Sequence, residues 1–286
     1  MKHFSAFLLG CLLLVEVGTS YAQKVEKISF ASWNIRWQSE SDIENGNAWK
    51  KRFEPIANVI RFYDFDIVAM QEGSASKRDD LAPLLNDYVF IEIDSTEHNP
   101  ILIKKDMFKL LDKGKFYLSE TPEKKSKSWD SKHNRFCLWA KLQKDSTQFF
   151  VFNTHFDYHG KTARTEGAKV MYQWIPSIAA NTPYIAAGDF NSVEGSVPYE
   201  ILMSIPGIKD AKDVAQFTHI VKKSYNYFDP YRNSKWDLDH VFVDSRIPVY
   251  RYGVLNEMYF DGDSYRYPSD HSPIMMVFEL PAASQP

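Results

Sequence analysis

The sequence predicts an α/β (α+β) protein in which two mixed β-sheets pack face to face and helices cover both outer faces. Short apolar runs of strand length recur along the chain, and several of them, such as DIVAM, FFVF and YIAA, are apolar at successive positions. Such runs are typical of strands that are buried on both faces. Helical segments lie between the runs, and no repeat or linker divides them. Together these features predict a four-layer α/β/β/α sandwich.

The strands are expected where β-branched and aromatic residues cluster between turn residues. They cover residues 28–33, 67–71, 88–93, 100–104, 136–142, 149–155, 184–187, 238–243, 249–254 and 274–280. A short polar turn at Lys144, Asp145 and Ser146 separates two of these runs, which predicts an antiparallel hairpin.

Helices are expected at residues 48–63, 78–85, 161–180 and 196–203. The 161–180 segment carries apolar residues at helical spacing, so one of its faces should pack on a sheet. Pro55 lacks the backbone N–H that a helix interior needs, so we expect it to begin or kink the 48–63 helix.

Residues 1–22 have the pattern of a secretory signal peptide. Lys2 precedes an apolar stretch over residues 6–15, and a small residue stands at each end of the triplet 20–22, just before Gln23. The apolar stretch is shorter than the ~18 residues needed to cross a bilayer, so no transmembrane segment is expected. We therefore expect a secreted or periplasmic protein with one domain over residues 23–286. Lipoprotein attachment at Cys11 is the alternative.

Composition narrows the choice of partners. Beyond the signal peptide the chain has only Cys137, so no intramolecular disulfide is expected. The net charge is −3, whereas nucleic-acid-binding domains usually carry a basic face. The basic stretch 124–127, with Lys132 and Arg135, is diluted by acidic residues and is interpreted as a solvated loop. A monomer that binds a small phosphorylated substrate fits this balance best, with nucleic acid as the alternative partner.

Acidic, amide and imidazole side chains stand at the ends of the predicted strands. They are Asn34, Glu72, His155, Asp157, Asp189, Asn191, Asp239, Asp270 and His271. Because α/β sheets bind ligands at the carboxyl ends of their strands, we expect these residues to meet in one crevice. Buried carboxylates need a cation, and oxygen ligands suit Mg²⁺ or alternatively Mn²⁺, whereas zinc would require more His and Cys.

Each of these residues alone also has a plainer explanation. Asp189 in GDFN could cap the loop that follows its strand, Glu72 could lie in a turn, and His155 could be a hydrogen-bonded histidine at a strand end. The occurrence of all the motifs together favours a functional site. Because residues i and i+2 of a strand share a face, we expect His155 and Asp157 to point to the same side, as should Asp189 and Asn191.

Six motifs in order resemble those of the endonuclease/exonuclease/phosphatase superfamily, whose fold is DNase I-like. They are SWNIRW, MQEG, NTHFDYHG, GDFNS, LDHVFV and SDHSP. The resemblance covers residues 28–280, and FYLSETP followed by RFCLWAKL is similar to a compact secreted bacterial branch. It implies hydrolysis of a phosphate ester by in-line attack of water with one metal ion. The chain departs from the branch over residues 92–103, a shorter stretch where the branch builds its substrate rim.

The resemblance also implies roles for the metal-binding and water-activating residues. Glu72 would be the principal Mg²⁺ ligand, with Asn34 and Asp270 nearby, directly or through water. Asp189 would align and help deprotonate the attacking water. Asn191 would orient that water or bond the phosphoryl oxygens.

The histidines would handle the phosphate. His271, held by Asp239, would act as a general base or, when protonated, would neutralise the phosphate. His155 would contact the scissile phosphate or assist the leaving group, and Asp157 would fix its neighbours.

Two arginines are candidate substrate-binding residues. Arg164 follows HFDYHGK at the start of a predicted helix and Arg135 precedes a strand, so either guanidinium could reach a phosphate. A surface arginine is the alternative for Arg164. The sequence thus predicts a secreted Mg²⁺-dependent phosphoesterase for a small phosphomonoester or phosphodiester, such as a sugar, inositol or lipid head-group phosphate. An exported nuclease and a catalytically silent binding module are the alternatives.

Overall fold

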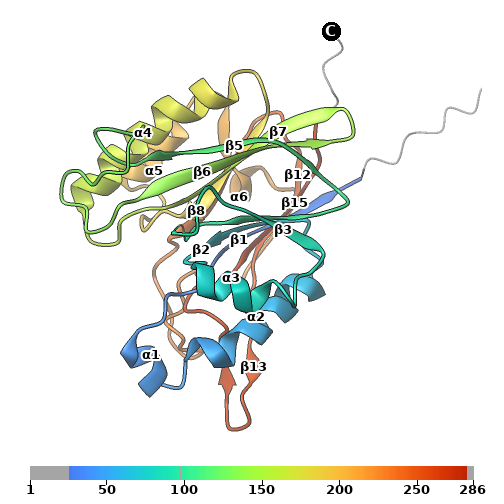
Figure 1. Ribbon diagram of the computed structural model, residues 1–286, viewed down its shortest axis with the longest axis vertical. Helices are drawn as coiled ribbons and strands as arrows, with labels where there is room; N and C mark the ends of the chain where they lie inside the picture. Colours follow the sequence, from blue (N-terminus) through green and yellow to red (C-terminus); the bar gives the residue numbers. More distant parts are fainter. Residues whose placement is uncertain (1–25, 97, 282–286) are drawn as a thin grey trace, which may run out of the picture.

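The structure is a computed structural model that describes residues 26–96 and 98–281. The predicted signal peptide, residues 1–22, lies outside the described residues. Two large sheets stack face to face and helices cover the outer face of each, which confirms the four-layer sandwich (Figure 1). In the part of the chain that is described, no helix combines the length and the apolar character that a membrane crossing needs.

The first sheet has seven strands. In spatial order they are β10 (Phe217–Ile220), β12 (Val249–Val254), β15 (Ile274–Phe278), β1 (Ile28–Asn34), β2 (Ile67–Gln71), β4 (Ile101–Lys104) and β3 (Tyr88–Ile91). β1 and β2 run parallel with Asn34 opposite Gln71, so the residues that follow both strands emerge at the same edge of the sheet.

The second sheet has six strands. In spatial order they are β5 (Lys109–Tyr117), β6 (Phe136–Lys144), β7 (Thr147–His155), β8 (Tyr184–Asp189), β11 (Asp239–Asp244) and β9 (Ile208–Asp210). The predicted hairpin joins β6 to β7, and its turn places Asp145 in a left-handed conformation with φ 52°. A small separate hairpin pairs β13 (Tyr259–Phe260) with β14 (Tyr265–Arg266).

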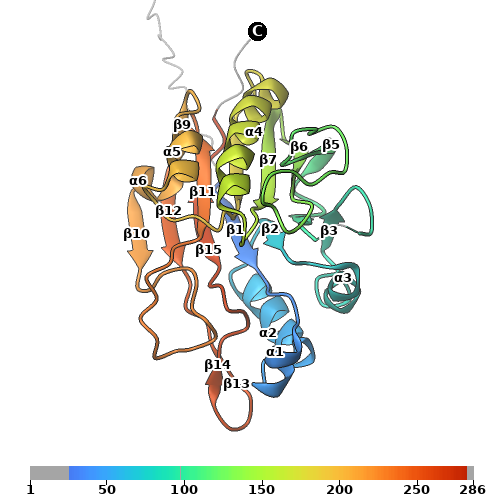
Figure 2. The same cartoon turned by 90° about the vertical axis from the view of Figure 1, so that its left-hand side faces the viewer.

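Helices form the two outer layers, as Figures 1 and 2 show from two sides. The first sheet is covered by α2 (Trp49–Phe62) and α3 (Ala75–Leu81), and the second by α4 (Lys161–Ala179) and α5 (Val197–Met203). The short helices α1 (Glu40–Glu44) and α6 (Ala211–Val214) lie in connections.

Three apolar cores hold the layers together. The central core lies between the sheets and joins side chains such as Phe30 and Ile67 of the first sheet to Leu138 and Val151 of the second. Separate cores lie between each sheet and its helices. Strands β1, β2, β7 and β8 are therefore buried on both faces, which explains why their sequences are apolar at successive positions.

Two expectations about single elements are wrong. Pro55 lies in the middle of α2 and not at its start, because burial of Trp49, Ile56 and Ile60 on one face outweighs the one helical hydrogen bond that Pro55 cannot make. The sequence reading also missed β5, whose sequence KLLDKGKFY is largely exposed at the edge of its sheet and has no continuous apolar run.

Candidate active site

Strand pairing aligns three of the predicted site residues in one row. Parallel pairing sets His155 at the end of β7 opposite Asp189 at the end of β8, and antiparallel pairing sets Asp239 of β11 opposite Asp189 on its other side. Gly188 permits the close approach of β7 and β8. Its φ is 153°, and a Cβ there would lie 2.0 Å from the carbonyl oxygen of Thr154. The glycine of GDFN is thus required by packing, and the aspartate after it faces the site.

His271 and Asp239 form a buried ion pair. The Nδ1 of His271 donates to Oδ2 of Asp239 at 2.7 Å, and both side chains are buried. Burial opposes the charge on the imidazole, but the carboxylates of Asp239 and Asp189 outweigh it and raise the pKa of His271 to about 10. Trp33 donates to the carbonyl of His271 at 2.8 Å and fixes its backbone. The pair therefore presents an imidazolium at neutral pH.

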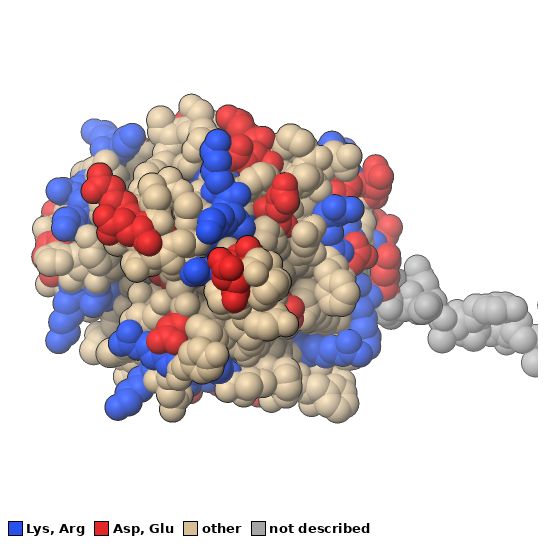
Figure 3. Space-filling view, turned by 90° about the horizontal axis from the view of Figure 1, so that it is seen from below, with Lys and Arg blue, Asp and Glu red and all other residues tan. Residues whose placement is uncertain are grey.

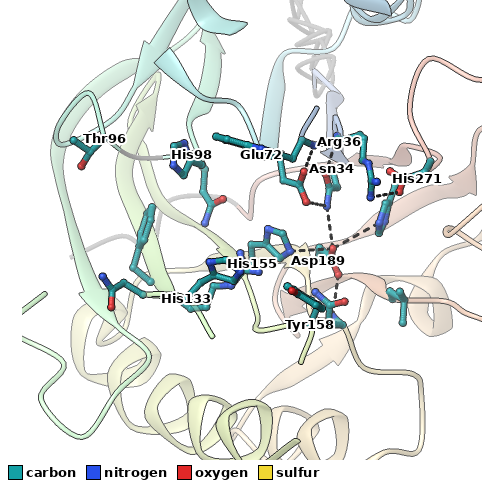
Figure 4. A pocket seen from close by; sticks show the side chains of 18 of the residues that line it. Asn34, Arg36, Glu72, Thr96, His98, His133, His155, Tyr158, Asp189 and His271 are labelled. Atoms are coloured by element: carbon teal, nitrogen blue, oxygen red, sulfur yellow. Dashed lines mark hydrogen bonds and ion pairs between the residues drawn. The ribbon is translucent and has the colours of Figure 1, made fainter. Parts of the chain in front are cut away.

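Asp189 lies at the centre of the site (Figure 4). Its Oδ2 accepts from the amide of Asn34 at 3.0 Å and lies 3.3 Å from Nε2 of His155 and 3.8 Å from Nε2 of His271. Its Oδ1 accepts from the backbone N–H of Asn191 at 2.9 Å. Burial raises the pKa of Asp189 to about 7, with Asp239 adding to the shift and His271 opposing it. Asp189 can thus gain or lose a proton near neutral pH.

His155 has a different charge state from His271. Burial, together with the nearby charges of Arg135 and His271, holds the pKa of His155 well below its ordinary value. The neutral ring therefore lies 3.3 Å from the carboxylate of Asp189 without being one half of an ion pair.

Glu72 follows β2 in a left-handed conformation with φ 61°. One carboxylate oxygen accepts from the amide of Asn34 at 3.2 Å, and the other accepts from the backbone N–H of Trp37. The buried ammonium of Lys77 in α3 donates to the carbonyls of Glu72, at 3.1 Å, and Arg36, and burial lowers the pKa of Lys77 to about 7. These contacts hold an otherwise strained turn so that its carboxylate faces the cavity.

Asp270 is buried beside Arg36, a residue to which the sequence analysis gave no role. The guanidinium of Arg36 donates to Oδ2 of Asp270 at 3.0 Å and to both carboxylate oxygens of Asp42 at 3.2 Å. Burial raises the pKa of Asp270, while His271 and Arg36 oppose that shift. Arg36 is part of the motif SWNIRW, but only the folded chain places it beside Asp270, which is 234 positions away.

Two sets of side chains could hold a divalent cation. Asp189, Asp239 and His271 bring one ligand atom each within 4.8 Å of one another. However, a protonated His271 explains why these two carboxylates lie close together, and an imidazolium is no metal ligand. At the other set, one amide nitrogen of Asn34 bridges the carboxylates of Glu72 and Asp189, where a cation would neutralise both. Asp270 interacts electrostatically with Glu72, and the two carboxylates offer only oxygen donors, which fit Mg²⁺, so we favour a cation at Glu72 and Asp270.

Asn34 itself has a constraint that the sequence analysis did not foresee. Its side-chain oxygen accepts from the backbone N–H of Arg36 at 2.9 Å, which turns the amide nitrogen toward the carboxylates. In this arrangement Asn34 would support a cation by orienting Glu72, or would coordinate it only after its amide rotates.

Asp157 does not point to the same side as His155, so that expectation is wrong. β7 ends at His155, and beyond it the alternation of a strand no longer applies. The carboxylate of Asp157 accepts instead from the backbone N–H groups of Lys132, His133, His159 and Gly160. These donors and Arg135 outweigh burial and hold the pKa of Asp157 at about 2. Asp157 thus ties two loops together beside the cavity.

The two candidate arginines differ. Arg164 donates to the carbonyls of Asp157 and Tyr158, at 2.9 and 3.1 Å, and does not line the cavity. Arg135 does line it, and its Nε is buried without a hydrogen-bond partner among the described residues. That nitrogen lies 3.8 Å from Asp157, and burial lowers the pKa of the guanidinium. Of these two arginines, Arg135 is therefore the one that a ligand in the cavity could contact.

The site opens into one cavity of about 720 Å³. Besides the residues above, the lining contains side chains that the sequence analysis did not assign to it: Trp37, Thr96, His98, Lys115, Tyr117, Lys125, His133, Asn134, Tyr158 and Tyr225. The basic stretch was interpreted as a solvated loop; Lys125 is exposed, as expected, but it also lies at the cavity.

Known proteins resemble this chain in sequence and fold. The model of the Endonuclease/Exonuclease/phosphatase family matches residues 31–271. The chain belongs to this family. The solved structure of the mannosyl-6-phosphatase of Bacteroides thetaiotaomicron VPI-5482 is 31% identical, with a TM-score of 0.85, over 88% of this chain and 100% of that chain. A family protein from Bacteroides vulgatus is 27% identical, with a TM-score of 0.81, over 89% of this chain and 99% of that chain.

More distant relatives match a smaller part of the chain or share the fold at low sequence identity. Protein angel of Drosophila melanogaster is 27% identical over 157 residues, which is 50% of this chain and 44% of that protein. The match thus spans less than half the length of this curated relative. The structure of D. rerio TDP2 complexed with single strand DNA product shares the fold at 18% identity and a TM-score of 0.70, over 89% of this chain and 99% of that chain. Family membership and the phosphatase neighbour together support a phosphoesterase.

Proposed function

We propose that the protein is a divalent-metal-dependent phosphoesterase that hydrolyses a small phosphomonoester, with a sugar phosphate as the favoured substrate class. The observation that carries the proposal is that Asp189 lies between two histidines in one cavity, of which His155 is neutral and His271 is positively charged. A neutral His155 and a protonated His271 supply different chemistry to the same phosphoryl group. The mannosyl-6-phosphatase neighbour supports a phosphate monoester of a sugar as the substrate.

Asp189 is the proposed base for the attacking water. A carboxylate with a pKa of about 7 is well matched to accept a proton near neutral pH. The backbone N–H of Asn191 and the amide of Asn34 fix its two oxygens, so its orientation is set before substrate binds. Asn191 also lines the cavity and is the proposed partner for that water or for a phosphoryl oxygen.

The phosphoryl group needs compensating positive charge as negative charge builds on its oxygens. The imidazolium of His271, held by Asp239, is one proposed source, and the guanidinium of Arg135 is the other. The neutral ring of His155 can donate one hydrogen bond to a phosphoryl or leaving-group oxygen.

Glu72 and Asp270 are the proposed metal ligands, with Asn34 supporting Glu72. A bound Mg²⁺ or Mn²⁺ would act as a Lewis acid on a phosphoryl oxygen. Arg36 occupies one oxygen of Asp270 and would keep that carboxylate in place.

A nuclease remains the second candidate, because TDP2 shows that this fold accommodates a DNA product. The charge balance of this chain favours the small substrate. Its net charge is −3, and on the face shown in Figure 3 basic and acidic side chains are interspersed without a continuous basic stripe. A protein gains most of its affinity for a nucleic-acid backbone from such a basic stripe.

The test is phosphate release from a panel of sugar, glycerol and inositol phosphates, and nicking of plasmid DNA, each with Mg²⁺ or with EDTA. We expect metal-dependent release of phosphate without nicking. Asp189→Asn should lower kcat at least ~10²-fold while the protein stays folded. Asp112→Asn, on the exposed face of β5, is the matched control. Nicking without release would establish the nuclease, and inactivity on every substrate would leave the binding module.

The proposal includes export of the enzyme. Residues 1–22 would be removed and residues 23–286 would form the mature domain. Sequencing of the secreted or periplasmic protein should give Gln23 as its first residue, whereas a lipid on Cys11 would establish the lipoprotein alternative.

A further inference from the structure

The cavity extends well beyond the catalytic residues. Its volume of about 720 Å³ lies in the range of sites that enclose a whole small ligand. Asn34, Glu72, Asp189 and His271 occupy its inner end. The proposed hydrolysis gives no role to the side chains around the rest, which we call the outer half: Trp37, Thr96, His98, His133, Asn134 and Tyr158.

Two pairs of rings border the outer half. Trp37 packs edge-on against His98 with ring centroids 5.2 Å apart, and His133 packs against Tyr158 at 5.7 Å. In Figure 4, His98 lies on one side of the open space and His133 and Tyr158 lie on the other. Trp37 is 50% exposed and Tyr158 is 53% exposed, so large apolar ring surfaces remain available to a ligand. A flat or puckered ring is the shape that such opposed surfaces accommodate.

The polar groups of the outer half can both donate and accept hydrogen bonds. Burial and the nearby arginines Arg78 and Arg135 lower the pKa values of His98 and His133, so both imidazoles are neutral at pH 7. A neutral imidazole has one donor and one acceptor, as a hydroxyl does. The amide of Asn134 adds two donors and an acceptor. This set matches a ligand that carries several hydroxyls.

The charges of the cavity argue against a cationic ligand. Among the described residues that line it, the only carboxylates are Glu72, Asp189 and Asp270, and each of them interacts with Asn34 or His271 of the catalytic group. Lys115 and Lys125 also line the cavity; Lys115 is paired with Asp94 at 2.7 Å, so a quaternary ammonium would meet the like charge of Lys125.

We propose that the outer half binds the leaving group as a neutral, ring-shaped polyol, with Trp37 and Tyr158 against the ring and His98, His133 and Asn134 at its hydroxyls. This rests on the proposed phosphoesterase function and makes these residues the determinants of its specificity. The substrate would be a hexose phosphate whose phosphate reaches the inner end while the ring stays between the two aromatic pairs.

The experiment compares kcat/KM for four esters with the wild-type enzyme and Mg²⁺. They are glucose 6-phosphate, glycerol 3-phosphate, phosphocholine and adenosine 5′-monophosphate. We expect glucose 6-phosphate to exceed glycerol 3-phosphate and phosphocholine by at least ~10-fold, because only the hexose fills the outer half. A nucleotide preferred over the hexose phosphate would show that the aromatic pairs stack on a base and would overturn the inference.

Variants test the residues directly. In Trp37→Ala and Tyr158→Ala, the ratio of kcat/KM for glucose 6-phosphate to that for glycerol 3-phosphate should fall at least ~10-fold, mainly through KM. Both esters are measured on one preparation, so loss of folded protein cancels in this ratio. Tyr231→Ala is the matched control, since Tyr231 is 95% exposed and does not line the cavity; its ratio should not change.

The outcomes separate the two proposals. Release from glycerol 3-phosphate without preference for the hexose, or an unchanged ratio in both variants, would refute the polyol subsite and leave the phosphoesterase. No release from any of the four esters would remove the phosphoesterase function and the subsite with it.

Discussion

Replacing Asp239 by Asn tests how the site controls the charge of His271. The carboxylate of Asp239 accepts from Nδ1 of His271 at 2.7 Å inside the protein, and it contributes most among the neighbouring carboxylates that raise the pKa of this histidine to about 10. Asn has the same shape and can still accept the hydrogen bond, but it carries no charge. The substitution therefore removes the attraction between the two charges and leaves His271 buried.

The separation of the charges on His271 and Asp239 sets the expected change in the proton affinity of His271. Two unit charges about 4 Å apart interact by about 4 kcal/mol at an effective dielectric constant of about 20. Since 1.4 kcal/mol is a factor of ten, the proton affinity of His271 should fall roughly 10³-fold. The alkaline limit of kcat/KM should then move from about pH 10 in the wild type toward about pH 7.

The free energy of unfolding should also depend on the charge of His271. The folded-state pKa of His271 is raised above its ordinary 6.5, so its stabilisation is fully present below pH 6.5 and is lost as pH rises through 10. The free energy of unfolding of the wild type should therefore fall across this window. Asp239→Asn should be less stable at pH 6 and should show a flatter profile up to pH 10.

The assay is kcat/KM for a small phosphate ester from pH 5 to pH 10, with urea unfolding at the same pH values. The ratio of the variant's kcat/KM to that of the wild type should fall about 10-fold from pH 6 to pH 8, because His271 loses its proton in this range in the variant and keeps it in the wild type. An alkaline limit that stays near pH 10 in the variant would refute the assignment of Asp239 and His271 as a charged pair.

Three further predictions concern the metal, the phosphate and the fold. Glu72→Gln should weaken Mn²⁺ binding, measured by calorimetry, at least ~10-fold, because a carboxylate ligand becomes a neutral amide; unchanged affinity would exclude Glu72 as a ligand. Arg135→Met should raise the inhibition constant of inorganic phosphate about 10-fold, because the guanidinium that lines the cavity is removed; equal inhibition would contradict its role. Gly188→Ala should destabilise the protein by several kcal/mol, because the added Cβ meets Thr154 at 2.0 Å, whereas Gly167→Ala in α4 finds ordinary contacts at 3.5 Å or more and should be tolerated. Equal unfolding midpoints for the two glycine variants would contradict the packing argument.

The fold was predictable from the sequence where burial dominates. The doubly buried strands β1, β2, β7 and β8 have continuous apolar runs, and the predicted layers follow from them. Strands at the edge of a sheet, such as β5, are held by backbone pairing and carry charged residues, so their sequences contain no continuous apolar run. Likewise Pro55 does not begin its helix, because packing of a whole helix face outweighs one missing hydrogen bond.

The site was predictable where a residue is the first or the last of a strand. His155, Asp189 and Asp239 meet through strand register, which the sequence patterns already imply. Arg36, Lys77 and the aromatic pairs of the outer half belong to loops or helix faces, whose directions only the folded chain determines. Asp157 shows the same limit, because the period-two rule fails once its strand has ended.

Crystals soaked in Mn²⁺ and measured at its absorption edge offer the most direct test of where the cation lies. The structure predicts one anomalous peak about 2.1–2.2 Å from a carboxylate oxygen of Glu72, with both nitrogens of His271 beyond ligand distance. A peak bonded to His271, between Asp189 and Asp239, would contradict the charged histidine pair and the roles built on it.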